Sequence, residues 1–419
     1  MKRILVALTL VAVLIGAALI YADSKRATRP PAPPENVGSV YPWGAMRLDE
    51  DQEEEDSLLE MSLMASFDSE PAGAFDPDRD EVREYAILAL SGGGSAGAFG
   101  AGLLSGWSKA GTRPDFKVVT GVSTGSLQAT FAFLGSDYDD ELTRVYEYGT
   151  DEIYRRRGIV AATLGDSAWD SAPLKELIDR HVDDAVLAAV AVKHRAGHRL
   201  YVGTSDMDTK EFVIWDMGRI ASSDRPDKLE RYRNVLLASC SIPVLFPPVY
   251  FEVGINGERY YAMHVDGGAR AQVFLRGFML DLEDALEDMS IPEDKYEFSL
   301  YIIRNGTAGN EPHRDNVSAS SLAIATEMMG SVFDLSSSSS LYRVYVLASR
   351  YGVDFNLAAI PDDFDPDFDS MIFDVDRMKR LYDFAFRQAE SGYAWSKTPV
   401  DIDKDELFER PGTLTGFAP

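Results

Sequence analysis

The stretch from Tyr85 to Gln128 most constrains the fold, because it contains two successive strand–turn–helix units. The first unit opens with the apolar run Tyr85–Leu90 and breaks at Ser91-Gly92-Gly93-Gly94. This pattern predicts a buried strand that ends in a tight turn. A helix can begin near Ser95, so the glycines lie between a strand and a helix.

The second unit places a serine in the turn. The strand Phe116–Thr120 breaks at Gly121-Val122-Ser123-Thr124-Gly125, and apolar residues then return at helical spacing. Small residues two positions before and after a serine let the chain reverse sharply, which exposes the hydroxyl at the N-terminus of the next helix. The helix dipole and the free N–H groups there favour a developing negative charge. Ser123 is therefore a candidate nucleophile.

A carboxylate is expected at a strand end much further along the chain. The predicted strand Arg259–Val265 stops at Asp266-Gly267-Gly268. An acid followed by two glycines lies at the rim of a sheet with no bulky neighbour in sequence. Before it, the predicted helix Leu229–Ser239 leads into a segment whose three prolines, Pro243, Pro247 and Pro248, exclude regular structure.

The remaining segments alternate between helical and strand patterns, which indicates the α/β class. We expect Ser171 to cap one helix, with a proline tolerated in its first turn, and the serine run Ser336–Ser340 to interrupt another. The further helices are predicted at 138–148, 171–181, 318–350 and 375–391, and the further strands at 199–204, 211–215, 249–251 and 298–304.

The charge balance excludes several classes of partner. Among 419 residues, 41 are basic and 68 acidic, which gives a net charge of −27. This balance argues against nucleic acid and against a broad electrostatic contact with anionic membranes. Cys240 is the single cysteine, so no intrachain disulfide forms. The five histidines show no zinc-hydrolase spacing, and we expect neither a metal nor another cofactor.

The N-terminal part differs in character from the body. Met1-Lys2-Arg3 precedes the uncharged apolar run Ile4–Ala22, which predicts a signal peptide over residues 1–22 or a membrane anchor over residues 4–22. Residues 23–80 are proline-rich and acidic and are predicted to be a disordered linker, with a short docking helix at 58–64. We expect the domain at 81–398 and a tail at 399–419. The body is then extracytoplasmic: periplasmic, secreted or anchored to the membrane.

Four sequence blocks in this order resemble the patatin-like phospholipase family. They are Gly92-Gly93-Gly94, Gly121-Val122-Ser123-Thr124-Gly125, the serine- and proline-containing block 238–248, and Asp266-Gly267-Gly268. The resemblance covers roughly Tyr85 to Gly268 and implies a three-layer α/β/α fold with a central, mostly parallel sheet. It also implies a lipid acyl-ester hydrolase of the phospholipase A or lysophospholipase type, with a lipid or other acyl ester as substrate and membrane contact.

The resemblance also assigns roles to individual residues. Ser123 would be the nucleophile, Asp266 the base, and the amides of Gly92, Gly93 and Gly94 the oxyanion hole. The glycines that support these motifs are Gly97, Gly121, Gly125, Gly267 and Gly268. The family usually has a lysine or arginine where this chain has Ala96, which puts a role of that cation in doubt.

Chemistry adds two expectations. A carboxylate with an ordinary pKa is a poor base toward an alcohol, so we predict that desolvation raises the pKa of Asp266. The apolar segments 159–164 and 321–332 are candidates for gating an acyl-chain pocket.

Three alternative interpretations remain. His264, two residues before Asp266, could complete a Ser-Asp-His triad. Gly92, Gly94 and Gly97 also match a dinucleotide-binding pattern, with Asp115 downstream, although this acid precedes the second strand instead of ending it. Lastly, the chain could be a non-catalytic lipid-binding or scaffold protein that retains the fold.

Overall fold

The computed structural model describes residues 28–35, 42–47, 62, 65–66, 69, 83–275, 296–307, 309, 317–365 and 368–400. The expected signal or anchor segment, most of the expected docking helix and the tail beyond residue 400 lie outside these ranges. Within them, no helix is both long enough and apolar enough to cross a bilayer.

A nine-stranded mixed sheet forms the centre of the molecule. Its main path runs β1-β7-β6-β3-β2-β10-β11, while β9 pairs with the end of β6 and β8 pairs with β9. The five strands β6, β3, β2, β10 and β11 are parallel to one another. The pairings of β1 with β7, β7 with β6, β6 with β9 and β9 with β8 are antiparallel. The strands are β1 Ala45–Arg47, β2 Arg83–Leu90, β3 Val118–Val122, β6 Arg199–Asp206, β7 Glu211–Asp216, β8 Val249–Ile255, β9 Glu258–Asp266, β10 Tyr296–Thr307 and β11 Asp354–Ile360.

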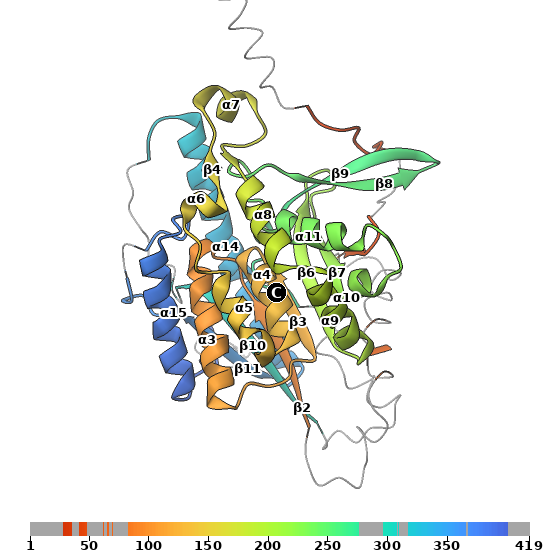
Figure 1. Ribbon diagram of the computed structural model, residues 1–419. Coiled ribbons are helices and arrows are strands. Elements are labelled where there is room, and N and C mark those ends of the chain that lie inside the picture. The colour runs from red at the N-terminus through yellow and green to blue at the C-terminus, as the bar shows by residue number, and fades with distance from the viewer. Residues whose placement is uncertain are drawn as a thin grey trace, which may run out of the picture.

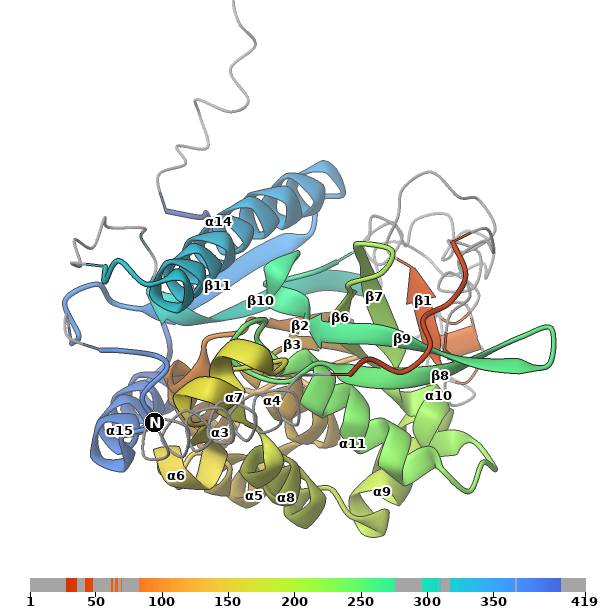
Figure 2. The same cartoon turned by 90° about the horizontal axis from the view of Figure 1, so that it is seen from above.

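Helices cover both faces of this sheet. Figure 2 shows α14 on one face and the remaining long helices on the other. The helices on the second face include α3 Gly97–Ala110, α4 Thr124–Leu134, α5 Asp139–Arg144, α8 Ala172–His181, α9 Asp184–Arg195, α10 Met217–Ser222, α11 Lys228–Ser239 and α15 Val375–Glu390. The first face carries α14 Ser321–Arg350. Two short helices, α6 Thr150–Ile153 and α7 Ile159–Leu164, lie at the upper end of the molecule in Figure 1. The predicted three-layer α/β class is confirmed.

Strand β2 shows why both faces need cover. Its side chains alternate between two hydrophobic clusters: Ala86, Leu88 and Leu90 face the cluster under α3 and α4, while Ile87 and Ala89 face the cluster under α14. All five are at most 1% exposed. Successive side chains of a strand point to opposite faces, so a continuous apolar run is the pattern of a strand covered on both sides.

The expected interruption of α14 at the serine run is wrong, because the helix continues through it. Ser340 Oγ donates to the carbonyl oxygen of Ser336 at 2.6 Å, one turn earlier, and Ser336 and Ser340 are both buried. The amide of Val273 donates to Ser340 Oγ at 3.3 Å. Small side chains here let α14 approach the segment that follows Asp266.

The expected disordered linker does not extend through residues 42–47. Strand β1 pairs antiparallel with β7, and Met46 is 4% exposed. Earlier in the linker, the carbonyl oxygen of Pro31 accepts a hydrogen bond from the amide of Tyr261 in β9. A proline can supply that acceptor on a strand edge although it has no N–H.

Further elements differ from the sequence predictions. Helices α9 and α10 and strand β11 were not expected, and the helix predicted at 138–148 is limited to α5 and its flanking turns. Ser171 precedes α8 but makes no capping bond through its side chain; Asp170 Oδ1 accepts the amide of Ala172 instead.

Helix α3 packs against α15 through glycines. A methyl group added at Gly106 would lie 2.2 Å from the carbonyl oxygen of Phe386, and one added at Gly102 would lie 2.3 Å from that of Tyr382. These contacts are with backbone atoms, which cannot turn aside as a side chain can. Only glycine therefore allows the two helices to approach this closely.

We predict that Gly106→Ala lowers the free energy of unfolding by about 1–3 kcal/mol, because the two helices must separate. Gly330→Ala in α14 is the matched control, since nothing lies within 4 Å of its added methyl group. That variant should be neutral or up to about 1 kcal/mol more stable, because alanine is the better helix former. Urea unfolding of both variants tests the prediction, and equal stabilities would contradict it.

Candidate active site

The glycine loop after β2 presents unbonded amides. The N–H groups of Gly92, Gly93 and Gly94 donate no hydrogen bond to any described residue, whereas those of Ser91 and Ser95 donate to Ile303 and Ser370. Gly93 has φ 149° and Gly94 has φ 54°, values that favour glycine. The loop thus contains three consecutive N–H groups without a partner among the described residues.

Asn305, at the end of β10, holds this loop. Its side-chain amide donates to the carbonyl oxygen of Ser91 at 2.9 Å, and its Oδ1 accepts the amide of Gly100 at 3.1 Å. Its own backbone amide donates to Ser91 Oγ at 2.9 Å. Asn305 is 2% exposed. It connects the loop to the first turn of α3, and sequence reasoning did not identify it because a single asparagine after a strand carries no distinctive signal.

Ser123 lies at the turn between β3 and α4 in a strained conformation. Its φ is 54° and its ψ is −128°, a region that a residue with a side chain seldom occupies. Such a conformation costs about 1–3 kcal/mol and persists only where the surroundings impose it. The side chain of Ser123 is at the N-terminus of α4, and the residue is 8% exposed.

Ser239 is the residue that fixes this turn. The amide of Ser123 donates to Ser239 Oγ at 2.9 Å, and Ser239 Oγ donates to the carbonyl oxygen of Gly203 in β6 at 2.8 Å. Ser239 is the last residue of α11 and is fully buried. Its hydroxyl therefore joins the turn after β3 to the neighbouring strand. The sequence signal was its place at the start of the serine- and proline-containing block, but its contact could not be inferred.

The two glycines of the turn are required by close approach. A methyl group at Gly121 would lie 2.4 Å from the carbonyl oxygen of Gly125, and one at Gly125 would lie 2.4 Å from that of Leu90. Both contacts are with backbone. The sequence interpretation of these glycines, missing bulk on either side of the serine, agrees with this geometry.

Asp266 reaches the same place from β9. Its amide donates to the carbonyl oxygen of Ser241, and its Oδ1 accepts the amide of Gly268 at 2.7 Å. Its Oδ2 has no hydrogen-bond partner among the described residues, but the side chain of Ser123 lies close enough to the carboxyl group to lower its pKa. The structure thus brings Ser123 and Asp266 together.

Burial sets the acidity of Asp266. The residue is 1% exposed, and loss of solvent raises the pKa of its carboxyl group to about 7. Hydrogen bonds from Ser123 and from the Gly268 amide lower the pKa but do not offset the burial. The predicted increase is confirmed in direction.

Gln272 is a further residue of the site that sequence reasoning missed. A methyl group at Gly92 would lie 2.4 Å from Gln272 Oε1 and 3.0 Å from Ser123 Cβ. One at Gly268 would lie 2.6 Å from Gln272 Nε2. The Gln272 side chain therefore extends from the glycine loop to the turn after Asp266. Its Oε1 is buried and has no partner among the residues described.

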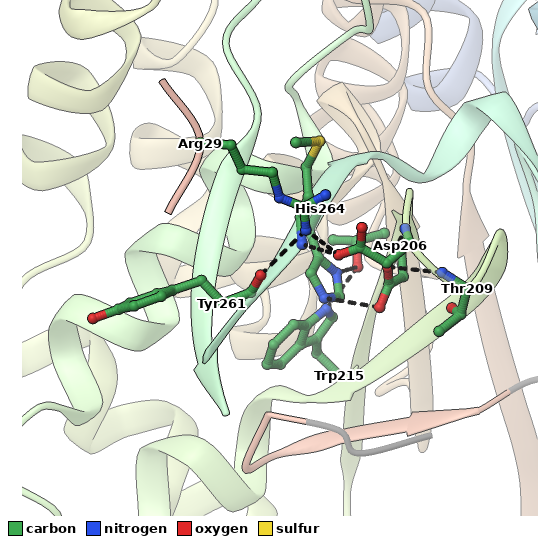
Figure 3. A network of polar contacts seen from close by, with 9 residues as sticks. Arg29, Asp206, Thr209, Trp215, Tyr261 and His264 are labelled. Carbon is green, nitrogen blue, oxygen red and sulfur yellow. Dashed lines mark hydrogen bonds and ion pairs between the residues drawn. The ribbon is translucent and has the colours of Figure 1, made fainter. Parts of the chain in front are cut away.

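The alternative catalytic histidine has other neighbours. His264 is fully buried between Trp215 and Phe251, and a 2.9 Å hydrogen bond joins its Nδ1 to the hydroxyl of Thr204. Burial lowers its pKa to about 3. Figure 3 shows its ring near Asp206 and Trp215, beside the network that Arg29 forms with Tyr261. No contact between His264 and Ser123 occurs in the part of the chain described here.

The acid of the dinucleotide alternative is also elsewhere. Asp115 forms an ion pair with Lys193 of α9, and its side chain is 67% exposed. It precedes β3 instead of ending it, as the sequence indicated. The glycine loop is followed by the α3 helix, but nothing joins Asp115 to this loop among the contacts of the described residues.

Comparison with known proteins gives one family match. Residues 88–279 match the model of the patatin-like phospholipase family. No curated protein matches the sequence. Several solved structures are similar to the chain, and two of them are named here. VipD from Legionella pneumophila is 11% identical, with a TM-score of 0.32, over 74% of this chain and 67% of that one. Human GIVD cytosolic phospholipase A2 is 10% identical, with a TM-score of 0.33, over 84% of this chain and 66% of that one. The chain thus spans about two thirds of the length of each.

We predict that Ser239→Ala lowers the free energy of unfolding by about 1–3 kcal/mol, because it leaves a buried amide at Ser123 and a buried carbonyl group at Gly203 without partners. Ser105→Ala is the control: this serine is also buried, but its hydroxyl has no partner among the described residues. Urea unfolding should separate the two variants. Equal effects would show that the Ser239 bridge does not hold the turn.

Proposed function

The chain contains a patatin-like phospholipase domain, which the family model matches over residues 88–279, and from this premise we propose that it hydrolyses lipid acyl esters with Ser123 as nucleophile and Asp266 as base. The substrate is a phospholipid or lysophospholipid, and the amides of Gly92, Gly93 and Gly94 stabilise the oxyanion.

One observation carries the proposal: a strained serine lies beside a buried acid and beside glycine amides that have no partner among the described residues. The Ser123 side chain lies close enough to the Asp266 carboxyl group to lower its pKa, and burial nevertheless raises that pKa to about 7. Gly92 is close enough to Ser123 that an added methyl group would lie 3.0 Å from its Cβ. A nucleophile, a base and electrostatic donors therefore share one site, which is the set that acyl transfer needs.

Each group has a defined step in this mechanism. Asp266 takes the proton of the Ser123 hydroxyl while Oγ attacks the ester carbonyl carbon, and the carbonyl oxygen becomes an oxyanion beside the glycine amides. Collapse breaks the ester bond, and the leaving alcohol takes the proton from Asp266. Water then attacks the acyl-enzyme, again with Asp266 as proton acceptor, and releases the fatty acid and free Ser123. Each preorganised donor can contribute about 3–4 kcal/mol to the oxyanion.

The raised pKa suits a two-residue mechanism. A carboxylate with a pKa of about 4 provides little driving force for removing a proton from an alcohol. At about 7, Asp266 is both substantially ionised at neutral pH and a stronger base. Because burial alone raises this pKa, the base needs no histidine between it and the serine.

We predict that Ser123→Ala and Asp266→Asn each lower kcat for hydrolysis of p-nitrophenyl butyrate by about 10⁴-fold or more, as for nucleophile and base in other serine hydrolases. The asparagine can still accept the Gly268 amide through Oδ1, so the fold should persist. The intact site should also react with a fluorophosphonate probe, and Ser123→Ala should not.

His264→Ala separates the dyad from a triad. Probe labelling corrects for any loss of folded protein, and the labelled fraction should hydrolyse the ester within about tenfold of the parent, since a general base typically contributes 10²–10⁴-fold. A loss as large as that of Asp266→Asn would overturn the dyad. Absence of labelling in the parent chain would support the non-catalytic alternative.

We also predict the pH dependence. Because the base must be ionised, kcat/KM should rise about tenfold per pH unit and level off near pH 7, the pKa of Asp266. An acid limb near pH 4, the ordinary value for aspartate, would contradict the proposed role of burial.

The same shift affects stability with a defined sign. The folded pKa lies above the unfolded one, so between about pH 4 and pH 7 the folded state binds the extra proton. Asp266 therefore reduces the free energy of unfolding progressively as the pH rises through this window. Asp266→Asn should remove that part of the dependence, which urea unfolding at a series of pH values can measure.

A further inference from the structure

A short hairpin projects from the upper end of the molecule in Figure 1. Strands β4 (Arg155–Arg156) and β5 (Trp169–Asp170) pair antiparallel, and α7 lies between them. The base of the hairpin is an aromatic cluster, in which the rings of Tyr154 and Trp169 stack at 4.0 Å and an interplanar angle of 5°. Phe246 packs edge-on against both rings. A firmly packed base therefore carries the α7 tip.

The base of this hairpin is connected to the candidate active site. The hydroxyl of Tyr154 donates to the carbonyl oxygen of Met371 at 2.8 Å. The preceding residue, Ser370, accepts the amide of Ser95, and a methyl group at Gly94 would lie 2.3 Å from the Ser370 carbonyl oxygen. The glycine loop and the hairpin thus share one supporting segment.

The composition of the tip contrasts with the rest of the chain. Val160 and Leu164 of α7 are each 39% exposed, although they are large apolar residues. No acidic residue occurs between Glu152 and Asp166, whereas the whole chain has a net charge of −27. Arg155 and Arg156 are exposed and, in the ranges described, form no ion pair. This tip is a local apolar and cationic surface on an acidic protein.

The N-terminal half of α14 adds a second apolar surface. Leu322, Ile324 and Met328 are 43%, 51% and 59% exposed. Figures 1 and 2 place this end of the helix and α7 at the same end of the molecule. The C-terminal half of α14 is buried against the sheet at residues such as Leu341 and Val344. The exposed half is therefore an extension of a well-anchored helix.

We propose that the α7 tip and the N-terminal half of α14 form the surface by which the protein docks on a phospholipid bilayer. The apolar side chains enter the boundary between headgroups and acyl chains, as amphipathic interfacial helices do. Arg155 and Arg156 contact the lipid phosphates, which match guanidinium groups in charge and geometry. This inference rests on the proposed function: it takes the substrate to be a phospholipid and adds that the protein meets this lipid in a bilayer.

Charge favours a lipid surface over a second copy of the chain. In a symmetric dimer formed through this tip, the same patch would occupy both sides. Both sides of that interface would carry Arg155 and Arg156, and like charges brought together across an interface are unfavourable. A phosphate-bearing surface instead supplies the opposite charge. The acidic remainder of the chain keeps this contact local and thereby orients the glycine-loop edge toward the lipid.

The experiment measures binding without turnover. The Ser123→Ala protein is sedimented with phosphatidylcholine vesicles, alone and with the added pair Val160→Asp and Leu164→Asp. We expect the pair to weaken binding about tenfold or more, because two apolar side chains are removed from the interface. The pair Arg155→Ser and Arg156→Ser should cause a smaller, severalfold loss. Ester hydrolysis is measured separately on the parent chain, so a failure of the docking proposal can be distinguished from a failure of the proposed catalytic function.

Helix α9 offers matched controls. Val192 is 61% exposed, and Arg195 is exposed there without an ion pair among the described residues. Val192→Asp and Arg195→Ser should bind vesicles within about twofold of the parent, as surface changes away from an interface do. Equal binding by the tip variants and these controls would overturn the proposal. The proposal would also be overturned if the parent protein did not bind vesicles but formed a dimer that the tip substitutions converted to a monomer.

Discussion

The backbone turn at Ser123 is the constraint on which the rest of the site depends. A serine with φ 54° between a strand and a helix is strained, and the surrounding contacts must offset that cost. Ser239 bonds the amide of this turn to β6, and Gly121 and Gly125 let neighbouring backbone approach to 2.4 Å of where their side chains would begin. The strain thus keeps the hydroxyl at one position. If the backbone at Ser123 could relax, the hydroxyl would no longer be held at this position.

The parallel centre of the sheet explains why remote segments meet here. Strands β2, β3 and β10 are parallel, so the glycine loop after β2, Ser123 after β3 and Asn305 near the carboxyl end of β10 lie at one edge. Strand β9 runs antiparallel to β6 and brings Asp266 opposite Thr204 at that edge. At this edge Asp266 is 1% exposed, so its carboxyl group is shielded from water as the core is. The burial that stabilises the fold is therefore the same burial that raises the pKa of Asp266.

Local sequence patterns predicted the strands, turns and helices that neighbouring residues in the sequence determine. The two strand–turn–helix units, the glycines around Ser123 and the strand that ends at Asp266 follow from apolar runs and turn residues. The sequence could not predict the roles of Ser239 and Asn305, because each bonds to a residue more than 100 positions away. It could not predict Gln272 either, because this side chain lies beside Gly92, which is likewise distant in the sequence. The serine run of α14 misled for a related reason. Its propensity suggests a break, but tertiary packing against Val273 favours the helix.

The acidity of Asp266 is governed by solvent and by two hydrogen bonds, with no charged group among its causes. Added salt would screen a pKa shift that an ion pair causes, but it would not remove a shift that burial causes, as at Asp266. The Ser123 side chain stabilises the carboxylate, and in the mechanism proposed above the carboxylate in turn accepts the proton of the serine hydroxyl. Each residue therefore adjusts the chemistry of the other. More water at this rim would lower the pKa of Asp266 and weaken it as the proposed base, so in that proposal the cover over this edge serves catalysis as well as the fold.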